Sequence, residues 1–263
     1  MKVIILAAGQ GIRLRPYTDN KPKCMVMLAG KALLHWQLMT LRSLGLQDIT
    51  VVGGYLSTQL DAPDTKLILN PNYANSNMVS TLFCARELFT PGEDLLICYG
   101  DIVYQRNVLQ SVIACESELC LAADRQWQKL WSLRMENPLD DAETFQLGPH
   151  NKVLELGKKP HSYDDVQAQY MGLIKIRGDC VEKFDVAYHN LDRDGLYDSK
   201  DFDNMYMTSF IQHLIDNEWD VSAALVNSGW LEVDTADELE HYNQLIKQGD
   251  LSSLFDLDKI NAA

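Results

Sequence analysis

Positive charge is scarce in this sequence. Its 263 residues include 23 lysines and arginines against 37 aspartates and glutamates, which gives a formal net charge of −14 and a pI of about 4.7. A surface of that sign repels polyanions over most of its area. We therefore expect no nucleic-acid partner, and we look for anionic ligands only where basic residues gather.

Long hydrophobic runs are also missing. No stretch approaches the roughly 18 to 20 apolar residues that a membrane span needs. The run "VIILAA" near the start is too short for the apolar region of a signal peptide, and Gly9, Gln10 and Gly11 end it. These absences predict a cytoplasmic protein without a membrane partner.

Paired cysteines are a third absence. The six cysteines form no C-x-x-C pair, although zinc ligands are usually closely paired in sequence. Several lie in apolar runs, as Cys98 does in "LLICYG". We expect buried, reduced thiols and no zinc site.

Apolar runs alternate with helical patterns through the first 125 residues, and this alternation predicts βαβ units with a mostly parallel sheet. Because right-handed crossovers bring the carboxyl ends of parallel strands to one edge, ligands are expected there. Gly45 is expected just after the first helix. Strands are expected at 2–8, 48–54, 65–70, 94–101 and 118–124, and helices at 32–45, 77–89 and 106–117.

The second half of the chain has a different pattern. It predicts an antiparallel hairpin followed by isolated strands, with a largely solvated acidic stretch at 192–220. Thr235 and Glu238 have the spacing of a capping box for the last helix. Strands are expected at 143–147, 152–156, 169–176, 220–226 and 229–234, and helices at 204–215 and 235–248.

The basic residues gather in the first loop, "LAAGQGIRLRPYTDNKPK" at 6–23. Its two arginines and two lysines accompany a single acid, which predicts a small anionic ligand. A glycine-rich turn after a strand can present backbone N–H groups to phosphate. A dinucleotide-binding fingerprint would need a third glycine at position 14, where this sequence has Leu14. A Walker A loop would need Gly-Lys-Ser or Gly-Lys-Thr, which is absent.

The whole loop resembles the signature of the nucleotidyltransferases that activate sugar phosphates and related small phosphates. That signature is an apolar strand, then L-A-A-G-x-G-x-R-L-x-P, then T, then P-K. The matching residues are Leu6, Ala7, Ala8, Gly9, Gly11, Arg13, Leu14, Pro16, Thr18, Pro22 and Lys23. The resemblance implies an α/β fold with a Rossmann-like mixed, mostly parallel sheet and an α+β elaboration in its second half.

The chain has no internal repeat, low-complexity tract or clear linker, which predicts one domain over 1–263 with an elaboration after about residue 125. Its expected parts are a nucleotide-binding core over about 1–125, an acceptor-side elaboration over about 126–230, and a closing strand and helix over 229–263. The implied reaction is attack by an acceptor phosphate oxygen on the α-phosphorus of a nucleoside triphosphate, releasing pyrophosphate. Arg13 is expected to grip the triphosphate and Lys23 to bridge the reacting phosphates. The implied nucleotide-binding residues are Leu6, Ala8, Gly9, Gly11, Arg13, Asn77 and Gly100.

Acids at two predicted strand ends suit Mg²⁺, which binds one or two carboxylates plus phosphate oxygens. Asp101 matches the strand-end G-D of the resembling enzymes, and Asp234 matches their C-terminal aspartate. Glu232 lies two residues before Asp234, so both would face one side of a strand and could bind one ion; the predicted metal ligands are Asp101, Glu232 and Asp234. The alternatives are that Glu232 is a solvated edge residue and that Asp234 caps the following helix.

Further stretches at 70–82, 127–143 and 154–175 resemble bacterial phosphocholine and aminoethylphosphonate cytidylyltransferases. This implies CTP as donor and a small amine-bearing phosphate or phosphonate as acceptor, in the decoration of cell-surface polymers. The expected acceptor-binding residues are Trp131, Asp141, Lys158 and Tyr170. Core packing remains an alternative for Trp127 and Trp131, as does a charged hairpin end for Lys158.

Two other functions stay open from the sequence. One is a sugar-1-phosphate nucleotidylyltransferase that uses UTP, dTTP or GTP. The other is a nucleotide-binding regulatory module that keeps the fold without catalysis. The sequence predicts neither the oligomeric state nor the number of metal ions.

Overall fold

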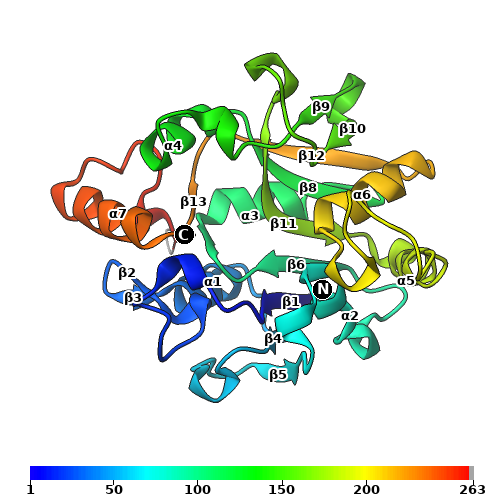
Figure 1. Cartoon of the computed structure of the whole chain (residues 1–263), viewed down its shortest axis with the longest axis horizontal. Coiled ribbons are helices and arrows are strands. Elements are labelled where there is room, and N and C mark those ends of the chain that lie inside the picture. The colour runs from blue at the N-terminus through cyan, green and yellow to red at the C-terminus, as the bar shows by residue number, and fades with distance from the viewer. Residues whose placement is uncertain (261–263) are drawn as a thin grey trace.

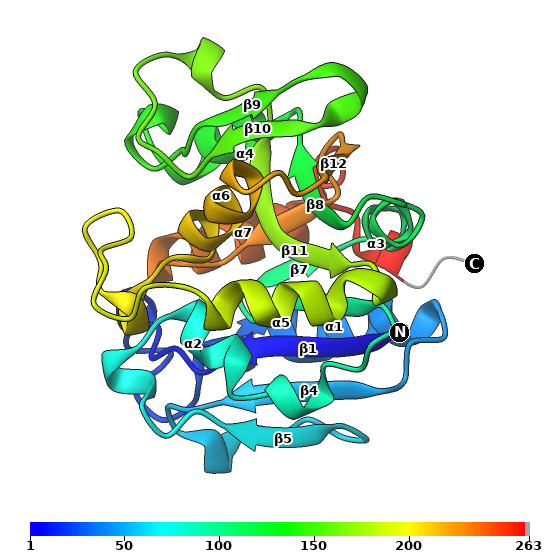
Figure 2. The same cartoon turned by 90° about the vertical axis from the view of Figure 1, so that its right-hand side faces the viewer.

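The computed structural model describes residues 1–260, and at its centre lies a seven-stranded sheet (Figures 1 and 2). The strand order is β12-β8-β11-β6-β1-β4-β5. Only β11 runs antiparallel to its neighbours, so the sheet is mixed and mostly parallel, as predicted. Its strands are β1 (Lys2–Ala7), β4 (Ile49–Gly53), β5 (Lys66–Leu69), β6 (Leu95–Tyr99), β8 (Leu119–Asp124), β11 (Gln169–Ile176) and β12 (Val221–Val226).

Three two-stranded sheets surround the central one. The predicted antiparallel hairpin is present as β9 and β10, and the last predicted strand, β13, pairs with β7. This pairing places the strand after Gly229 beside the segment after Asp101. The pairs are β2 (Met27–Leu28) with β3 (Lys31–Ala32), β7 (Ile102–Tyr104) with β13 (Trp230–Glu232), and β9 (Phe145–Leu147) with β10 (Val153–Leu156).

Helices cover both faces of the sheet. Figure 2 shows α2, α5 and α6 on its near side, with α1 and α3 on the far side. The helices are α1 (Leu33–Ser43), α2 (Met78–Phe83), α3 (Arg106–Ile113), α4 (Trp127–Arg134), α5 (Val181–His189), α6 (Met207–Asp216) and α7 (Ala236–Gln248).

Two hydrophobic clusters form the core, one on each face of the sheet. Alternate residues of β1 divide between them, with Val3 and Ile5 in one and Ile4 and Leu6 in the other. A strand that is buried on both faces needs an unbroken apolar run, which explains why "VIILA" does not alternate with polar residues.

Several predicted details are confirmed. Gly45 has φ +78 just after α1, a conformation that glycine adopts without penalty. Thr235 and Glu238 form the capping box of α7. All six cysteines lie within the described residues and are free, but only four are buried, because Cys84 and Cys115 are partly exposed.

Other predicted boundaries are wrong. The helix expected at 77–89 ends at Phe83, because the chain leaves the α-helix at Ala85 and continues as a 3₁₀ turn at Arg86–Leu88. This bend brings the rings of Phe83 and Phe89 to 5.4 Å. Strand β6 ends two residues before Asp101. The acidic stretch is solvated only in part, because Phe202 and Met205 are buried in the core.

Across residues 1–260, no helix combines the length and the hydrophobicity that crossing a bilayer requires.

Candidate active site

The predicted basic and acidic residues meet in one charged cluster. The Lys23 ammonium lies 2.7 Å from Asp101 Oδ2 and 2.7 Å from Asp234 Oδ1. The Arg13 guanidinium pairs with the other carboxylate oxygen of Asp234. These residues come from the first loop, the turn after β6 and the segment after β13, so the fold assembles the cluster from three distant parts of the chain.

The conformation of the first loop delivers Lys23 to this place. Gly11 has φ +61, and a Cβ there would lie 2.9 Å from Lys23 Cβ, so a larger residue would be both strained and crowded. The Thr18 hydroxyl donates to the Gly11 carbonyl at 2.8 Å and closes the loop. Gly11 therefore shapes the loop and does not itself line a cavity.

The cluster is electrostatically balanced. Burial alone would lower the pKa of Lys23, but the carboxylates of Asp101 and Asp234 outweigh it and raise that pKa above its ordinary value. Burial would raise the pKa of Asp234, yet Lys23 and Arg13 bring it below its usual range. The Lys23 ammonium and the Asp234 carboxylate are consequently charged together at neutral pH.

A first cavity of about 130 Å³ opens on one side of the cluster. It lies at the carboxyl ends of β1 and β6, the edge where a ligand was expected. Six predicted nucleotide or metal residues line it together with the lysine of the loop: Leu6, Ala8, Gly9, Lys23, Asn77, Gly100 and Asp101.

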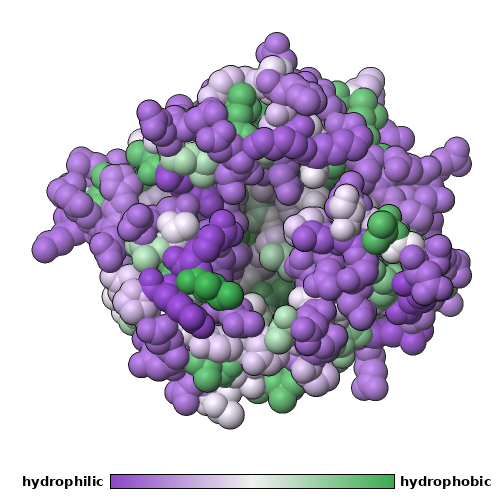
Figure 3. All heavy atoms as spheres, in the orientation of Figure 1, coloured by the Kyte–Doolittle hydropathy of each residue, from purple (hydrophilic) through white to green (hydrophobic). Residues whose placement is uncertain are grey.

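A second cavity of about 250 Å³ opens on the other side. Asn77 and Met78 line both cavities, so the two adjoin. Figure 3 shows the molecule hollowed near the centre of one face, with mostly hydrophilic side chains around the opening. Besides Asn77, six predicted residues line the second cavity: Arg13, Trp131, Asp141, Tyr170, Glu232 and Asp234.

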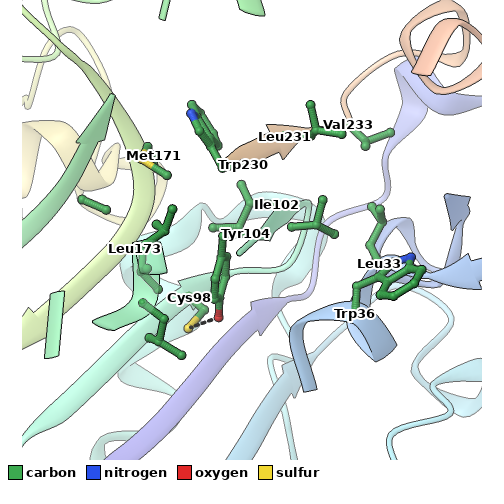
Figure 4. Packing of buried hydrophobic residues seen from close by; sticks show 14 of the residues in the cluster. Leu33, Trp36, Cys98, Ile102, Tyr104, Met171, Leu173, Trp230, Leu231 and Val233 are labelled. Atoms are coloured by element: carbon green, nitrogen blue, oxygen red, sulfur yellow. Dashed lines mark hydrogen bonds between the residues drawn. The ribbon is translucent and has the colours of Figure 1, made fainter. Parts of the chain in front are cut away.

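The alternation along β13 orients the two C-terminal acids. Leu231 and Val233 are fully buried, and Figure 4 shows them among the apolar side chains of the core. Glu232 and Asp234 therefore face the opposite side, toward the second cavity. Because the side chain of Thr235 caps α7 and that of Asp234 binds Lys23, the helix-capping alternative for Asp234 is wrong.

Glu232 is not a solvated edge residue, because Arg134 of α4 holds it. The Arg134 guanidinium donates to Glu232 at 2.6 Å and to Glu238 at 2.9 Å, and its side chain is only 2% exposed. It also lies 4.6 Å from the centre of the Trp131 ring. Burial raises the pKa of Glu232, and the charge of Arg134 opposes that rise. Sequence reasoning missed Arg134, although it lies in the stretch 127–143 that resembles the cytidylyltransferases.

The oxygen atoms at the cluster suit a divalent cation. Asp101 Oδ1 is buried and receives no hydrogen bond from the described residues. Asp101 and Asp234 already share one cation, the Lys23 ammonium. Within residues 1–260 no three acidic, histidine or cysteine side chains form a complete metal site. The residues thus fit an ion such as Mg²⁺, which takes one or two carboxylates and completes its shell with phosphate oxygens and water.

One predicted acceptor-binding residue, Lys158, lies elsewhere, and so does Trp127, the neighbour of Trp131 on the helical face. The Lys158 side chain is 55% exposed and binds Glu155 at 2.5 Å, and it does not line the second cavity. The alternative prediction, a charged residue at the end of a hairpin, is therefore the one that describes it. Trp127 is buried, and its indole N–H donates to the Val166 carbonyl at 3.0 Å. Trp127 therefore packs in the core, and Trp131 belongs to the same core cluster while also lining the cavity.

Sequence reasoning also missed Glu143 and Gln169, which line the second cavity. Tyr170 of β11 joins them there, just before a bulge in the strand. The pairing of β11 with β8 shifts register between Tyr170 and Ile174, and Gly172 within that shift has φ +76. A Cβ on Gly172 would lie 2.5 Å from the Tyr99 ring.

The chain matches the family model of the MobA-like NTP transferase domain over residues 3–147. It is 42% identical over 249 residues to a CTP:phosphoglutamine cytidylyltransferase of Campylobacter jejuni, covering 91% of this chain and 98% of that protein. It is also 42% identical over 91 residues to a choline-phosphate cytidylyltransferase of Streptococcus pneumoniae, covering 33% and 40% of the two chains.

A solved structure of the CTP:phosphocholine cytidylyltransferase from Streptococcus pneumoniae has the same fold. The two superpose with a TM-score of 0.69 over 93% of this chain and 98% of that one, at 22% identity. The likeness confirms the predicted Rossmann-like architecture.

Proposed function

The chain belongs to the MobA-like NTP transferase family, and on that premise we propose that it transfers CMP from CTP to a small amine-bearing phosphate or phosphonate, releasing pyrophosphate. Two relatives named as cytidylyltransferases support CTP as the donor. The relative that aligns with nearly the whole chain is named for phosphoglutamine. A phosphorylated amino acid carries a phosphate and an ammonium group, so it fits the proposed acceptor class.

One observation carries the proposal: the two cavities meet at the cluster of Lys23, Asp101 and Asp234. Lys23 and Asp101 line the first cavity, and Asp234 lines the second. A nucleotide in the first cavity and an acceptor in the second would therefore bring their phosphates together at a buried ammonium. Transfer between two polyanions requires positive charge at that point.

The proposed reaction is an in-line displacement. An oxygen of the acceptor phosphate attacks the α-phosphorus, the new P–O bond forms, and the bond from the α-phosphorus to the bridging oxygen breaks, so that pyrophosphate leaves. The acceptor phosphate is largely ionised at neutral pH, so no general base is needed. Lys23 would stabilise the charge on the reacting phosphates, and Arg13, which is 66% exposed, would reach the triphosphate.

We propose that Asp101 and Asp234 hold Mg²⁺ together with the substrate phosphates, with Glu232 beside them. The unpartnered Asp101 Oδ1 supports this assignment. A bound Mg²⁺ would neutralise phosphate charge at the reacting centre. The nucleotide-binding role of Leu6, Ala8, Gly9, Asn77 and Gly100 is proposed on the same cavity.

The test is pyrophosphate release with each of CTP, UTP, dTTP and GTP over an acceptor panel. The panel holds phosphoglutamine, phosphocholine, 2-aminoethylphosphonate and hexose 1-phosphates. The proposal predicts turnover with CTP and an amine-bearing acceptor, with a CDP-linked product found by mass spectrometry. Turnover with a hexose 1-phosphate alone would establish the sugar-activating alternative instead. Nucleotide binding without any pyrophosphate release would indicate the regulatory module.

A further inference from the structure

Glu143 is an acid without a partner in the second cavity. It lies between the 3₁₀ turn at Pro138–Asp140 and strand β9, and it lines the cavity with Tyr170 and Gln169. Its backbone N–H donates to Gln169 Oε1 at 3.4 Å. Among the described residues, no group donates a hydrogen bond to its carboxylate and no cation pairs with it. Glu143 is partly buried, and its carboxylate has no hydrogen bond from residues 1–260 to stabilise its charge.

The other charges around the cavity are already compensated. Asp234 pairs with Arg13 and Lys23, and Glu232 pairs with Arg134. Asp141 is 41% exposed, and the Arg134 guanidinium lies 3.9 Å from it. Glu143 is therefore the one cavity-lining acid of residues 1–260 that is left for a ligand.

A second group points to the same kind of ligand. The indole N–H of Trp131 is buried and has no acceptor among the described residues, although the residue lines the cavity and is 2% exposed. An indole nitrogen can only donate, whereas an ionised carboxylate can only accept. A head group that offers N–H donors to Glu143 and an oxygen to Trp131 would satisfy both.

The aromatic rings around the cavity are less suited to a quaternary ammonium. Such a cation has no N–H and is best held over open ring faces. Arg134 lies 4.6 Å from the Trp131 ring centre, and Lys200 lies 5.4 Å from that of Tyr206. Tyr99 and Tyr170 pack edge to face against each other, with centres 5.7 Å apart. Of the five aromatic residues within 1–260 that line the cavity, Trp131 and Tyr206 thus already carry a cation, and the fifth, Trp230, packs with its ring centre 6.0 Å from that of Trp131.

We propose that Glu143 determines acceptor specificity by accepting hydrogen bonds from a protonated amine or another N–H group of the acceptor. The enzyme then favours head groups with N–H donors over their N-methylated counterparts. This inference rests on the proposed function and narrows its acceptor class: a primary ammonium or an amino acid fits, and a trimethylammonium group does not.

The test uses three acceptors that have the same phosphate on the same two-carbon chain: phosphoethanolamine, phosphocholine and ethyl phosphate. The wild-type protein should give phosphoethanolamine a kcat/KM about tenfold or more above that of phosphocholine, as expected for a hydrogen bond to a charged group. Glu143→Gln keeps the size of the side chain and should lower kcat/KM for phosphoethanolamine by about 10- to 100-fold, mainly through KM. The same substitution should change kcat/KM for ethyl phosphate little, because that acceptor has no amine.

The matched control is Glu155→Gln, an acid of the neighbouring hairpin that lies outside the cavity and should leave all three acceptors unaffected. An equal loss for all three acceptors in Glu143→Gln would overturn the inference, and so would a wild-type preference for phosphocholine. If the wild type turns over an acceptor with CTP and Glu143→Gln does not alter its selectivity, only this inference fails. If CTP does not bind in calorimetry and no acceptor reacts, the proposed function fails with it.

Discussion

At the residue scale, Lys23 holds the site together before any substrate binds. Its ammonium joins carboxylates that belong to the two cavities, at 2.7 Å from each. Without that charge, the buried Asp101 and Asp234 would repel each other across the place where phosphates are proposed to react. Lys23 therefore has a structural role in the free protein and a proposed catalytic role in the complex.

Replacing Lys23 tests both roles. Lys23→Ala should lower turnover by on the order of 10²-fold or more, the cost of losing a preorganised charge at a reacting centre. Steady-state pyrophosphate release measures this effect. Lys21→Ala, in the same loop but outside both cavities, should keep near-normal turnover. Near-normal turnover in Lys23→Ala would remove Lys23 from the mechanism.

Glu143 makes a separate prediction about stability. Burial, with added repulsion from Glu232 and Asp141, raises its pKa from 4.5 to about 7. Between these two pH values the folded state binds more protons than the unfolded state. The free energy of unfolding therefore falls as pH rises, because Glu143 must ionise inside the folded protein. Glu143→Gln should therefore raise the free energy of unfolding at pH 8 by on the order of 1 to 3 kcal/mol and change it little at pH 4.

Urea unfolding of both proteins at the two pH values measures this difference. Lower stability of Glu143→Gln at pH 8 would show that the carboxylate has a stabilising partner in the free protein. A gain in stability with a loss of selectivity is the behaviour expected of a residue kept for binding.

At the element scale, local patterns predict what depends on neighbouring residues and fail where distant parts of the chain meet. The unbroken apolar run of β1 and the capping box of α7 are local, and both are confirmed. The pairing of β7 with β13 is not local, and no pattern predicts β7. The loop signature identifies Lys23 and Arg13. Arg134 and Glu143 lie in the resembling stretch 127–143, but nothing in that stretch singles them out, and their neighbours in space reveal their place in the site.

The bulge in β11 gives a prediction at this scale. Gly172→Ala would place a methyl group 2.5 Å from the Tyr99 ring, at φ +76, and so combine strain with overlap. Gly249→Ala is the matched control, because Gly249 has φ +83 and no atom within 4 Å of its Cβ position. Gly249→Ala should cost about 1 to 2 kcal/mol of unfolding free energy, and Gly172→Ala clearly more. Equal losses in urea unfolding would contradict the role given to this close approach.

At the scale of the whole molecule, both halves of the chain build one sheet. Strands β8, β11 and β12 come from beyond residue 118 and continue the sheet that β1, β4 and β6 begin. The prediction of one domain over 1–263 stays a prediction, and its last three residues lie outside the described ones. Cytoplasmic location also stays a prediction. The site lies where the two halves meet, so its acids and bases depend on the complete fold.

The most direct test of the central claim is calorimetric titration of CTP into the wild type and Asp234→Asn, with Mg²⁺ and with excess EDTA. If Lys23, Asp101 and Asp234 converge with a divalent ion on one triphosphate, the wild type should bind CTP about tenfold or more tightly with Mg²⁺, a difference of ~1.4 kcal/mol or more. Asp234→Asn should lose most of that difference. Equal CTP affinity with Mg²⁺ and with EDTA in both proteins would contradict the account.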